Sequence, residues 1–331
     1  MSLRTTALRL AFWLGVAVLA PSQALAHSSD GAQDPLVDMT SLHQVAPDIL
    51  VALDRRVPLV PNIGIISGKK AILVVDTGLG RANGERVYEA ALRIANGRRI
   101  YLTTTHFHPE HSFGASAFPR ASLIMNAAQL DELREKGPAY LELFRQIGPA
   151  ARTALVDTVP PETAVVYRHR HVIDLGGTTV ELREAPAHTR GDQVIFVPES
   201  RVLFTGDLAE TRFFPVLIDK DSNGSRWIDV LGQLIALRPA VIVPGHGEVT
   251  DRRLLDDVRE MLIWMRAEVD RGVEKGIPPE TMVSQIAAAA RHRYPGWDNG
   301  QYLSYDILSF RDDAMARDEE IGQGPGSDNK K

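Results

Sequence analysis

The sequence contains no cysteine, so no disulfide can support its fold and any bound metal must be held by nitrogen and oxygen donors. It also lacks an excess of basic residues, because its 37 Lys and Arg are outnumbered by 42 Asp and Glu and the formal net charge is −5. This balance gives no basic footprint for a nucleic-acid partner. No stretch beyond the first 26 residues is apolar enough to cross a bilayer, and we therefore expect no stable membrane insertion of the mature chain.

The remaining composition is that of an ordinary globular protein. Apolar residues make up 44 % of the 331 positions and charged residues 24 %. This length is ample for a buried core in one large domain or two modest ones.

The N-terminal stretch is typical of a secretory signal peptide. Arg4 and Arg9 form a basic flank, residues 10–20 form an apolar core, and Ala24-Leu25-Ala26 is a small-x-small cleavage site. The apolar core is shorter than the roughly 20 residues that a membrane-spanning helix needs, although a retained anchor helix is the alternative. We expect cleavage before His27 and a periplasmic or secreted protein.

The most informative segment is Thr-Thr-Thr-His-Phe-His-Pro-Glu-His at residues 103–111, which follows an apolar run. Imidazole nitrogens and carboxylate oxygens are ligands that Zn²⁺ accepts. A strand ending in a tight loop would present His106 and His108 to one ion, and Glu110 and His111 to a neighbouring ion. The alternative is a solvated polar loop whose histidines bind nothing.

Three later segments supply further donors and favour the metal interpretation. His188, Asp207 and His246 each follow a short apolar, strand-like run and lie in a loop that contains glycine. Five of the ten histidines thus fall into one consistent set.

Together these segments resemble the metallo-β-lactamase-fold hydrolase superfamily. The features that carry the resemblance are, in chain order, Asp76-Thr77-Gly78, the cluster at 106–111, His188, Thr205-Gly206-Asp207 and Pro244-Gly245-His246-Gly247. The resemblance implies an α+β fold, a four-layer αβ/βα sandwich, with the helices after residue 250 as an extension. Asp-Thr-Gly also occurs in the catalytic loops of aspartic proteases, but a single-chain enzyme of that class would carry a second such tripeptide, and none is present.

The resemblance also implies a role for each donor. One zinc ion would be bound by His106, His108 and His188, the second by Glu110, His111 and His246, with Asp207 bridging the two. Asp76, Thr105 and Asp192 would hydrogen bond to the ligands without touching the metal. Catalysis would rest on a metal-bound hydroxide, with Glu110 and Asp207 as the carboxylates that take part.

Glu110 departs from the family pattern, which usually has Asp at this position. The extra methylene moves the carboxylate by roughly 1.5 Å on an unchanged backbone, whereas metal–ligand distances tolerate about 0.2 Å. Either the loop after Pro109 is shaped to fit Glu110, or the second site is weakened. In the second case one zinc ion would remain and Glu110 would act as general base.

The expected substrate is a small molecule with an ester, thioester, lactone or lactam carbonyl. The pattern looks most like glyoxalase II and the exported sulfur-oxidation or quinoprotein-associated zinc hydrolases. Three alternatives stay open: β-lactamase activity as the main role, an iron-dependent oxidoreductase of the sulfur-dioxygenase kind, and a non-catalytic metal-binding protein.

Hydrophobic periodicity predicts four clear helices, at 83–96, at 126–146 with a break at Gly137-Pro138, at 225–237 with Ser225 as cap, and at 251–272. The expected domain organisation is a signal peptide at 1–26, a disordered lead at 27–44, the metal-binding domain at 45–250, a helical extension packed on the same domain at 251–316, and a disordered tail at 317–331.

Overall fold

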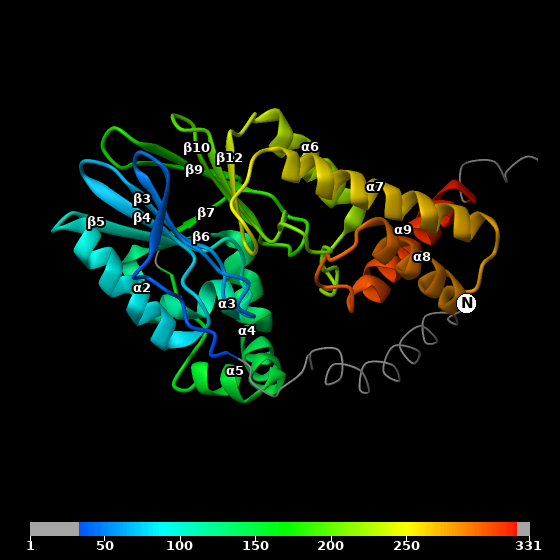
Figure 1. The fold of residues 1–331 in the computed structure, drawn as a ribbon, viewed down its shortest axis with the longest axis horizontal. Helices are drawn as coiled ribbons and strands as arrows, with labels where there is room; N and C mark the ends of the chain where they lie inside the picture. The colour runs from blue at the N-terminus through cyan, green and yellow to red at the C-terminus, as the bar shows by residue number, and fades with distance from the viewer. Residues whose placement is uncertain (1–32, 164, 323–331) are drawn as a thin grey trace, which may run out of the picture.

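The computed structural model describes residues 33–163 and 165–322, so the expected signal peptide at 1–26 and the last nine residues lie outside the described part. Two β-sheets face each other and helices cover the outer face of each sheet (Figure 1). This arrangement confirms the predicted αβ/βα sandwich.

The first sheet has seven strands in sequence order. Its first four strands pair antiparallel and its last three join as parallel neighbours. The strands are β1 (Leu42–Ala46), β2 (Ile49–Ala52), β3 (Ile63–Ser67), β4 (Ala71–Val75), β5 (Arg99–Thr103), β6 (Leu123–Asn126) and β7 (Val165–Tyr167). Strand β4 is buried along its whole length, as expected for a strand with both faces covered.

The second sheet has five strands in the order β12-β11-β10-β9-β8. Strands β8 to β11 pair antiparallel, whereas β11 and β12 are parallel because a helix connects them. The strands are β8 (Arg170–Asp174), β9 (Thr179–Glu184), β10 (Gln193–Val197), β11 (Val202–Gly206) and β12 (Val241–Pro244).

Helices form the outer layers. Next to the first sheet are α2 (Gly80–Ala95), α3 (Pro109–Ser112), α4 (Ala127–Ile147) and α5 (Pro149–Ala154), with short 3₁₀ turns at Phe113–Ala117 and Arg120–Ser122. Next to the second sheet are α6 (Gly224–Ala236), α7 (Arg253–Glu274), α8 (Pro279–Arg293) and α9 (Leu303–Gly322). Within the described residues, no helix combines the length and the apolar character needed to cross a membrane.

Apolar side chains form three buried layers that match this architecture. One layer lies between the sheets, one between the first sheet and α2 to α5, and one between the second sheet and α6 to α9. The sheets approach closely at Gly64, where an added Cβ would lie 2.3 Å from the ring of Phe204. Helices α7 to α9 share one apolar core with α6, so the segment after residue 250 packs on the same body.

Helix α4 differs from the sequence-based prediction, because it runs unbroken through Gly137 and Pro138. Proline inside a helix costs about 3 kcal/mol, since it removes one backbone hydrogen bond and crowds the preceding turn. The apolar face of α4 offsets this cost, because Leu133, Leu141 and Phe144 on both sides of the proline are buried.

Three boundaries also differ. The side chain of Asn223, and not Ser225, caps α6 by accepting a hydrogen bond from the Arg226 N–H. The described part of the expected disordered lead is packed, because Val37 is buried and its N–H donates to Asn83. Helix α9 continues to Gly322, beyond the expected start of the tail at 317.

We expect Pro138→Ala to raise the free energy of unfolding by about 1–2 kcal/mol. The helix regains a hydrogen bond, and this gain exceeds the loss that comes from the greater freedom of the unfolded chain. Pro138 is exposed, so the change removes no buried contact. Denaturant unfolding measures the difference. Pro149→Ala is the control, because Pro149 begins α5, where proline is tolerated, and no gain is expected there. An unchanged or lower stability of Pro138→Ala would contradict this account of α4.

Candidate metal centre

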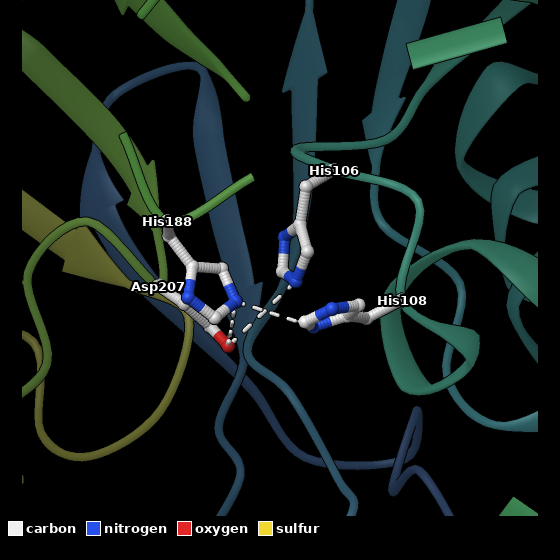
Figure 2. Close-up of side chains that lie close together, drawn as sticks. All are labelled: His106, His108, His188 and Asp207. Carbon is white, nitrogen blue, oxygen red and sulfur yellow. Dashed lines mark hydrogen bonds and ion pairs between the residues drawn. The ribbon is translucent and has the colours of Figure 1, made fainter. Parts of the chain in front are cut away.

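All seven predicted donors meet at one edge of the two sheets. One group consists of His106, His108, His188 and Asp207, and a second of Glu110, His111, Asp207 and His246; within each group the ligand atoms lie within 4.8 Å of one another. Figure 2 shows the side chains of the first group pointing toward one another from three separate segments of chain. Asp207 belongs to both groups.

The local backbone explains how one short segment supplies four donors. Strand β5 ends at Thr103, and the chain then turns into the single helical turn α3, which begins at Pro109. Asp76, at the end of the parallel neighbour β4, accepts a hydrogen bond from the Thr105 N–H at 2.7 Å and fixes this turn. The whole segment is buried, so its position is set by the fold and not by solvent.

Each of the five histidines uses one ring nitrogen to bind the surrounding protein. The Nδ1–H of His111 donates to Asp76 Oδ2 at 2.9 Å. The hydroxyl of Thr105 donates to the same carboxylate and accepts from His106 Nδ1 at 3.1 Å. Because the outer nitrogens carry the protons, Nε2 of both rings faces the centre with a free lone pair.

The other three rings follow the same rule with different partners. His188 Nδ1–H donates to the carbonyl of Val216 at 2.9 Å, and His246 Nδ1–H to the carbonyl of Val60 at 3.0 Å. His108 uses the other ring nitrogen for its outer bond, since its Nε2–H donates to Asp219 Oδ2 at 3.1 Å. This leaves His108 Nδ1 facing His188 Nε2 at 3.2 Å. These two nitrogens can share a proton in a hydrogen bond, and in the neutral rings both lone pairs are available to one cation.

Several buried donor atoms at the centre have no hydrogen-bond partner among the described residues: His106 Nε2, Glu110 Oε2, His111 Nε2 and Asp207 Oδ1. Buried polar atoms are rarely left unpaired, because desolvation without a partner costs about 1–3 kcal/mol for each atom. Asp207 lies between the histidines, with its oxygens 3.2 Å from His111 Nε2 and 3.7 Å from His106 Nε2. These nitrogen and oxygen donors fit a pair of divalent metal ions.

Glu110 lies with the second group despite its extra methylene. It is the second residue of α3 and is only 8 % exposed, and its carboxylate is directed to the centre together with His111, Asp207 and His246. Glu110 is thus positioned as a member of the second group, which the first of the two outcomes expected from the sequence requires.

Charge and burial set the protonation of the cluster. Burial lowers the pKa of His188 to about 4 and that of His106 well below its usual value, aided by the neighbouring imidazoles. Burial opposes ionisation of Asp207, but the histidines around it outweigh burial and hold its pKa well below the usual value. Burial also opposes protonation of His108 and His111, but the carboxylates beside them outweigh burial and raise the pKa of both rings. Neutral imidazole and ionised carboxylate are the forms that bind metal, so metal binding at these two rings would release protons.

Asp192 supports the loop that carries His188. Its carboxylate accepts hydrogen bonds from the N–H groups of Ala187 and Thr189 and from the Thr189 hydroxyl. Burial raises the pKa of Asp192 to about 7 in spite of these bonds. Asp76 and Thr105 thus bond to the rings of metal donors, whereas Asp192 bonds to the residues on either side of His188.

The sequence analysis missed further polar residues beside the cluster. Asp219 binds His108 and also Lys136 Nζ at 3.0 Å, and the ring of Tyr140 stacks on His108. Glu210 is buried three residues after Asp207, and burial together with the Asp207 charge raises its pKa well above the usual value. No motif distinguishes these residues, although Glu210 lies only three residues after the Thr-Gly-Asp segment.

Comparison with known proteins identifies relatives that contain the same fold. The chain is 21 % identical over 260 residues to a linear primary-alkylsulfatase of Pseudomonas sp. (strain ATCC 19151), covering 67 % of this chain and about half (49 %) of that protein. It is 29 % identical over 209 residues to the acyl-coenzyme A thioesterase MBLAC2 of Bos taurus, covering 56 % of this chain and 72 % of the relative.

Among solved structures, an inverting sec-alkylsulfatase from Pseudomonas sp. superposes with a TM-score of 0.62 at 14 % identity, covering 82 % of this chain and 50 % of that one. The sequence profile of the metallo-beta-lactamase superfamily matches residues 56–246, which include every donor of the two groups. With the sandwich fold and the paired His/Asp cluster in place, the chain belongs to the metallo-beta-lactamase superfamily and is a metal-dependent hydrolase of that family.

Proposed function

We propose that this protein is a dinuclear zinc hydrolase that cleaves acyl thioesters or esters. The observation that carries the metal site is the convergence of two donor groups whose ligand atoms lie within 4.8 Å of one another, with several of these buried atoms lacking a hydrogen-bond partner among the described residues. In this proposal His106, His108 and His188 hold one zinc ion, Glu110, His111 and His246 hold the other, and Asp207 contacts both. Five imidazoles and two carboxylates suit zinc, and they would also accept iron.

Zinc bound at such a site lowers the pKa of water and polarises an acyl oxygen. The protein contributes the orientation of each donor, since all five imidazoles are fixed by an outer hydrogen bond. Asp207 belongs to both groups and keeps them together, and the carboxylate of Glu110 completes the second group.

The electrostatics around the cluster favour a neutral reacting group. Lys136 pairs with Glu132, Asp219 and Asp221, and Arg56 pairs with Glu248 and Asp298. These two basic side chains are therefore already neutralised by carboxylates. A sulfate ester or the carboxylate of a lactam antibiotic would gain from an unpaired cation, whereas an acyl carbonyl does not need one. The similarity to an acyl-coenzyme A thioesterase supports the same substrate class.

Alkyl sulfate hydrolysis is the second candidate. It is favoured by the length of the match to the primary-alkylsulfatase, which covers 67 % of this chain against 56 % for the thioesterase. Lactam hydrolysis, iron-dependent oxidation of persulfides and metal binding without turnover are further outcomes that the same experiment separates.

We expect the purified chain to contain about two zinc ions and to hydrolyse a medium-chain acyl-coenzyme A faster than dodecyl sulfate or a chromogenic lactam. Elemental analysis and substrate-loss assays measure both quantities. Asp207→Asn is the control, since it removes the shared charge and should abolish turnover by any of these routes. One iron per chain with oxygen uptake, or faster cleavage of the sulfate, would replace the proposal with the corresponding alternative.

We expect Gly245→Ala to lower metal affinity about 10- to 100-fold, because a Cβ at this position would lie 2.1 Å from Asp207 Oδ1 and displace that carboxylate. Metal content after competition with a chelator measures the loss. The matched control is Gly232→Ala in α6, where the nearest atom to an added Cβ is 3.6 Å away and metal binding should be unchanged. Native affinity in Gly245→Ala would show that Asp207 does not need its present position.

We also propose export, on the basis of the basic flank, apolar core and cleavage site in residues 1–26. The mature protein recovered from a Gram-negative expression host should begin at His27 and appear in the periplasmic fraction. N-terminal sequencing tests this, and an uncleaved chain in the cytoplasmic fraction would contradict it. Ala26→Arg is the matched variant, because it removes the small residue at the cleavage site and should block processing.

A further inference from the structure

The loop between β11 and α6 contacts two histidines of the first metal group; we call residues 213–222 the Asp219 loop. The carbonyl of Val216 accepts from His188 Nδ1–H, and the carboxylate of Asp219 accepts from His108 Nε2–H. The hydroxyl of Ser222 also donates to the carbonyl of His188. These bonds decide which nitrogen of each ring faces the centre, so the position of the loop sets the geometry of the first metal group.

The C-terminal helices hold this loop from one side. Asp306 of α9 accepts a hydrogen bond from the Leu217 N–H at 2.9 Å, in the middle of the loop. The Phe214 N–H donates to the carbonyl of Asp298 at 3.0 Å, and the buried ring of Phe214 packs against Trp297. Leu217 lies next to Val216 and two residues before Asp219, so a shift at Leu217 moves both bonds to the histidines.

Helix α4 holds the loop from the opposite side. Lys136 Nζ lies 3.0 Å from Asp219 Oδ1 and 2.8 Å from Asp221 Oδ2. Asp219 therefore uses one oxygen for Lys136 and the other for His108. The ring of Tyr140 stacks on His108, with 5.1 Å between centroids and 16° between planes. The loop is thus held by two helices that are far apart in the sequence.

The carboxyl group of Asp306 is not needed for the stability of the fold. It is 1 % exposed and lies in α9 among the apolar residues Leu303, Ile307 and Phe310, and its second oxygen has no hydrogen-bond partner among the described residues. Burial raises the pKa of Asp306 well above its usual value. A buried carboxyl group with one partner is more costly than an apolar side chain of similar size, so its contribution must lie in the Leu217 bond.

We propose that Asp306 is a positioning residue for the metal centre, which holds the Asp219 loop through Leu217 so that His108 and His188 present the correct nitrogens. The helical extension is then part of the metal site and not only a cover for the second sheet. This inference depends on the metal centre but not on which ester is cleaved, and metal affinity therefore tests it separately from the substrate.

The decisive variant is Asp306→Leu, which keeps the number and branching of the side-chain heavy atoms, suits the apolar surroundings and removes the acceptor. We expect its thermal stability to match or exceed that of the parent, while zinc affinity falls about 10- to 100-fold, the range for lost partners of metal ligands. Asp306→Asn should rescue affinity, because its Oδ1 still accepts from Leu217. Asp312→Leu, an exposed position on the same helix, is the control and should leave affinity unchanged.

Two spectroscopic readouts complete the test. In the ¹⁵N-histidine spectrum of the zinc-loaded protein, the ring N–H signals of His108 and His188 should shift or disappear in Asp306→Leu and persist in Asp306→Asn. In the parent chain the Leu217 amide should exchange slowly with solvent, which requires no variant to fold. Native zinc affinity and unchanged ring signals in Asp306→Leu, equal losses in Asp306→Asn, or rapid exchange at Leu217 would each overturn the proposal.

Discussion

The structure depends on the convergence of buried metal donors at one edge of the two sheets. Nitrogens of His106, His108, His111 and His188 and the carboxylates of Glu110 and Asp207 meet there, and several of their inward atoms have no hydrogen-bond partner among the described residues. In a buried site such atoms are costly without a cation, because they have lost water and gained no partner. The outer hydrogen bonds prevent the rings from turning away, and the packing of two sheets prevents the strand ends from separating. A metal ion bound here would therefore stabilise the folded state.

The topology of the two sheets explains why the donors come from strand ends. Strands β4 and β5 in one sheet and β11 and β12 in the other are parallel pairs, so their carboxyl ends lie at the same edge. Asp76, Asp207 and His246 lie within two residues of the ends of β4, β11 and β12. The close approach of backbone at Gly245 then leaves Asp207 little freedom. A rigid scaffold thus holds side chains whose mutual interactions, without metal, are unfavourable.

The same reasoning shows how much the sequence could predict. The apolar runs that precede the donors and the seven donors themselves were accessible, because apolar runs ending in Gly and His or Asp are local signals. The fit of Glu110 was not, since it depends on where the single turn of α3 directs one carboxylate. The course of α4 through Pro138 was also missed, because the burial of apolar side chains on both sides of the proline outweighed its tendency to end a helix. Asp219 and Asp306 carry no signal at all; their contacts with His108 and Leu217 join positions about 90 to 110 residues apart.

Through those long-range contacts the helical extension supports the Asp219 loop in addition to covering the second sheet. Its apolar residues join α6 in one core, which fixes α9 firmly against the second sheet. A firmly packed helix is a better support for a loop than another loop would be, since a ligand displaced by a few tenths of an ångström already loses coordination. The bond from Leu217 to Asp306 transfers that rigidity to Val216 and Asp219, and through them to His188 and His108. The packing of α9 and the metal affinity of the centre are thus linked by three hydrogen bonds, which the backbone of residues 216–219 connects.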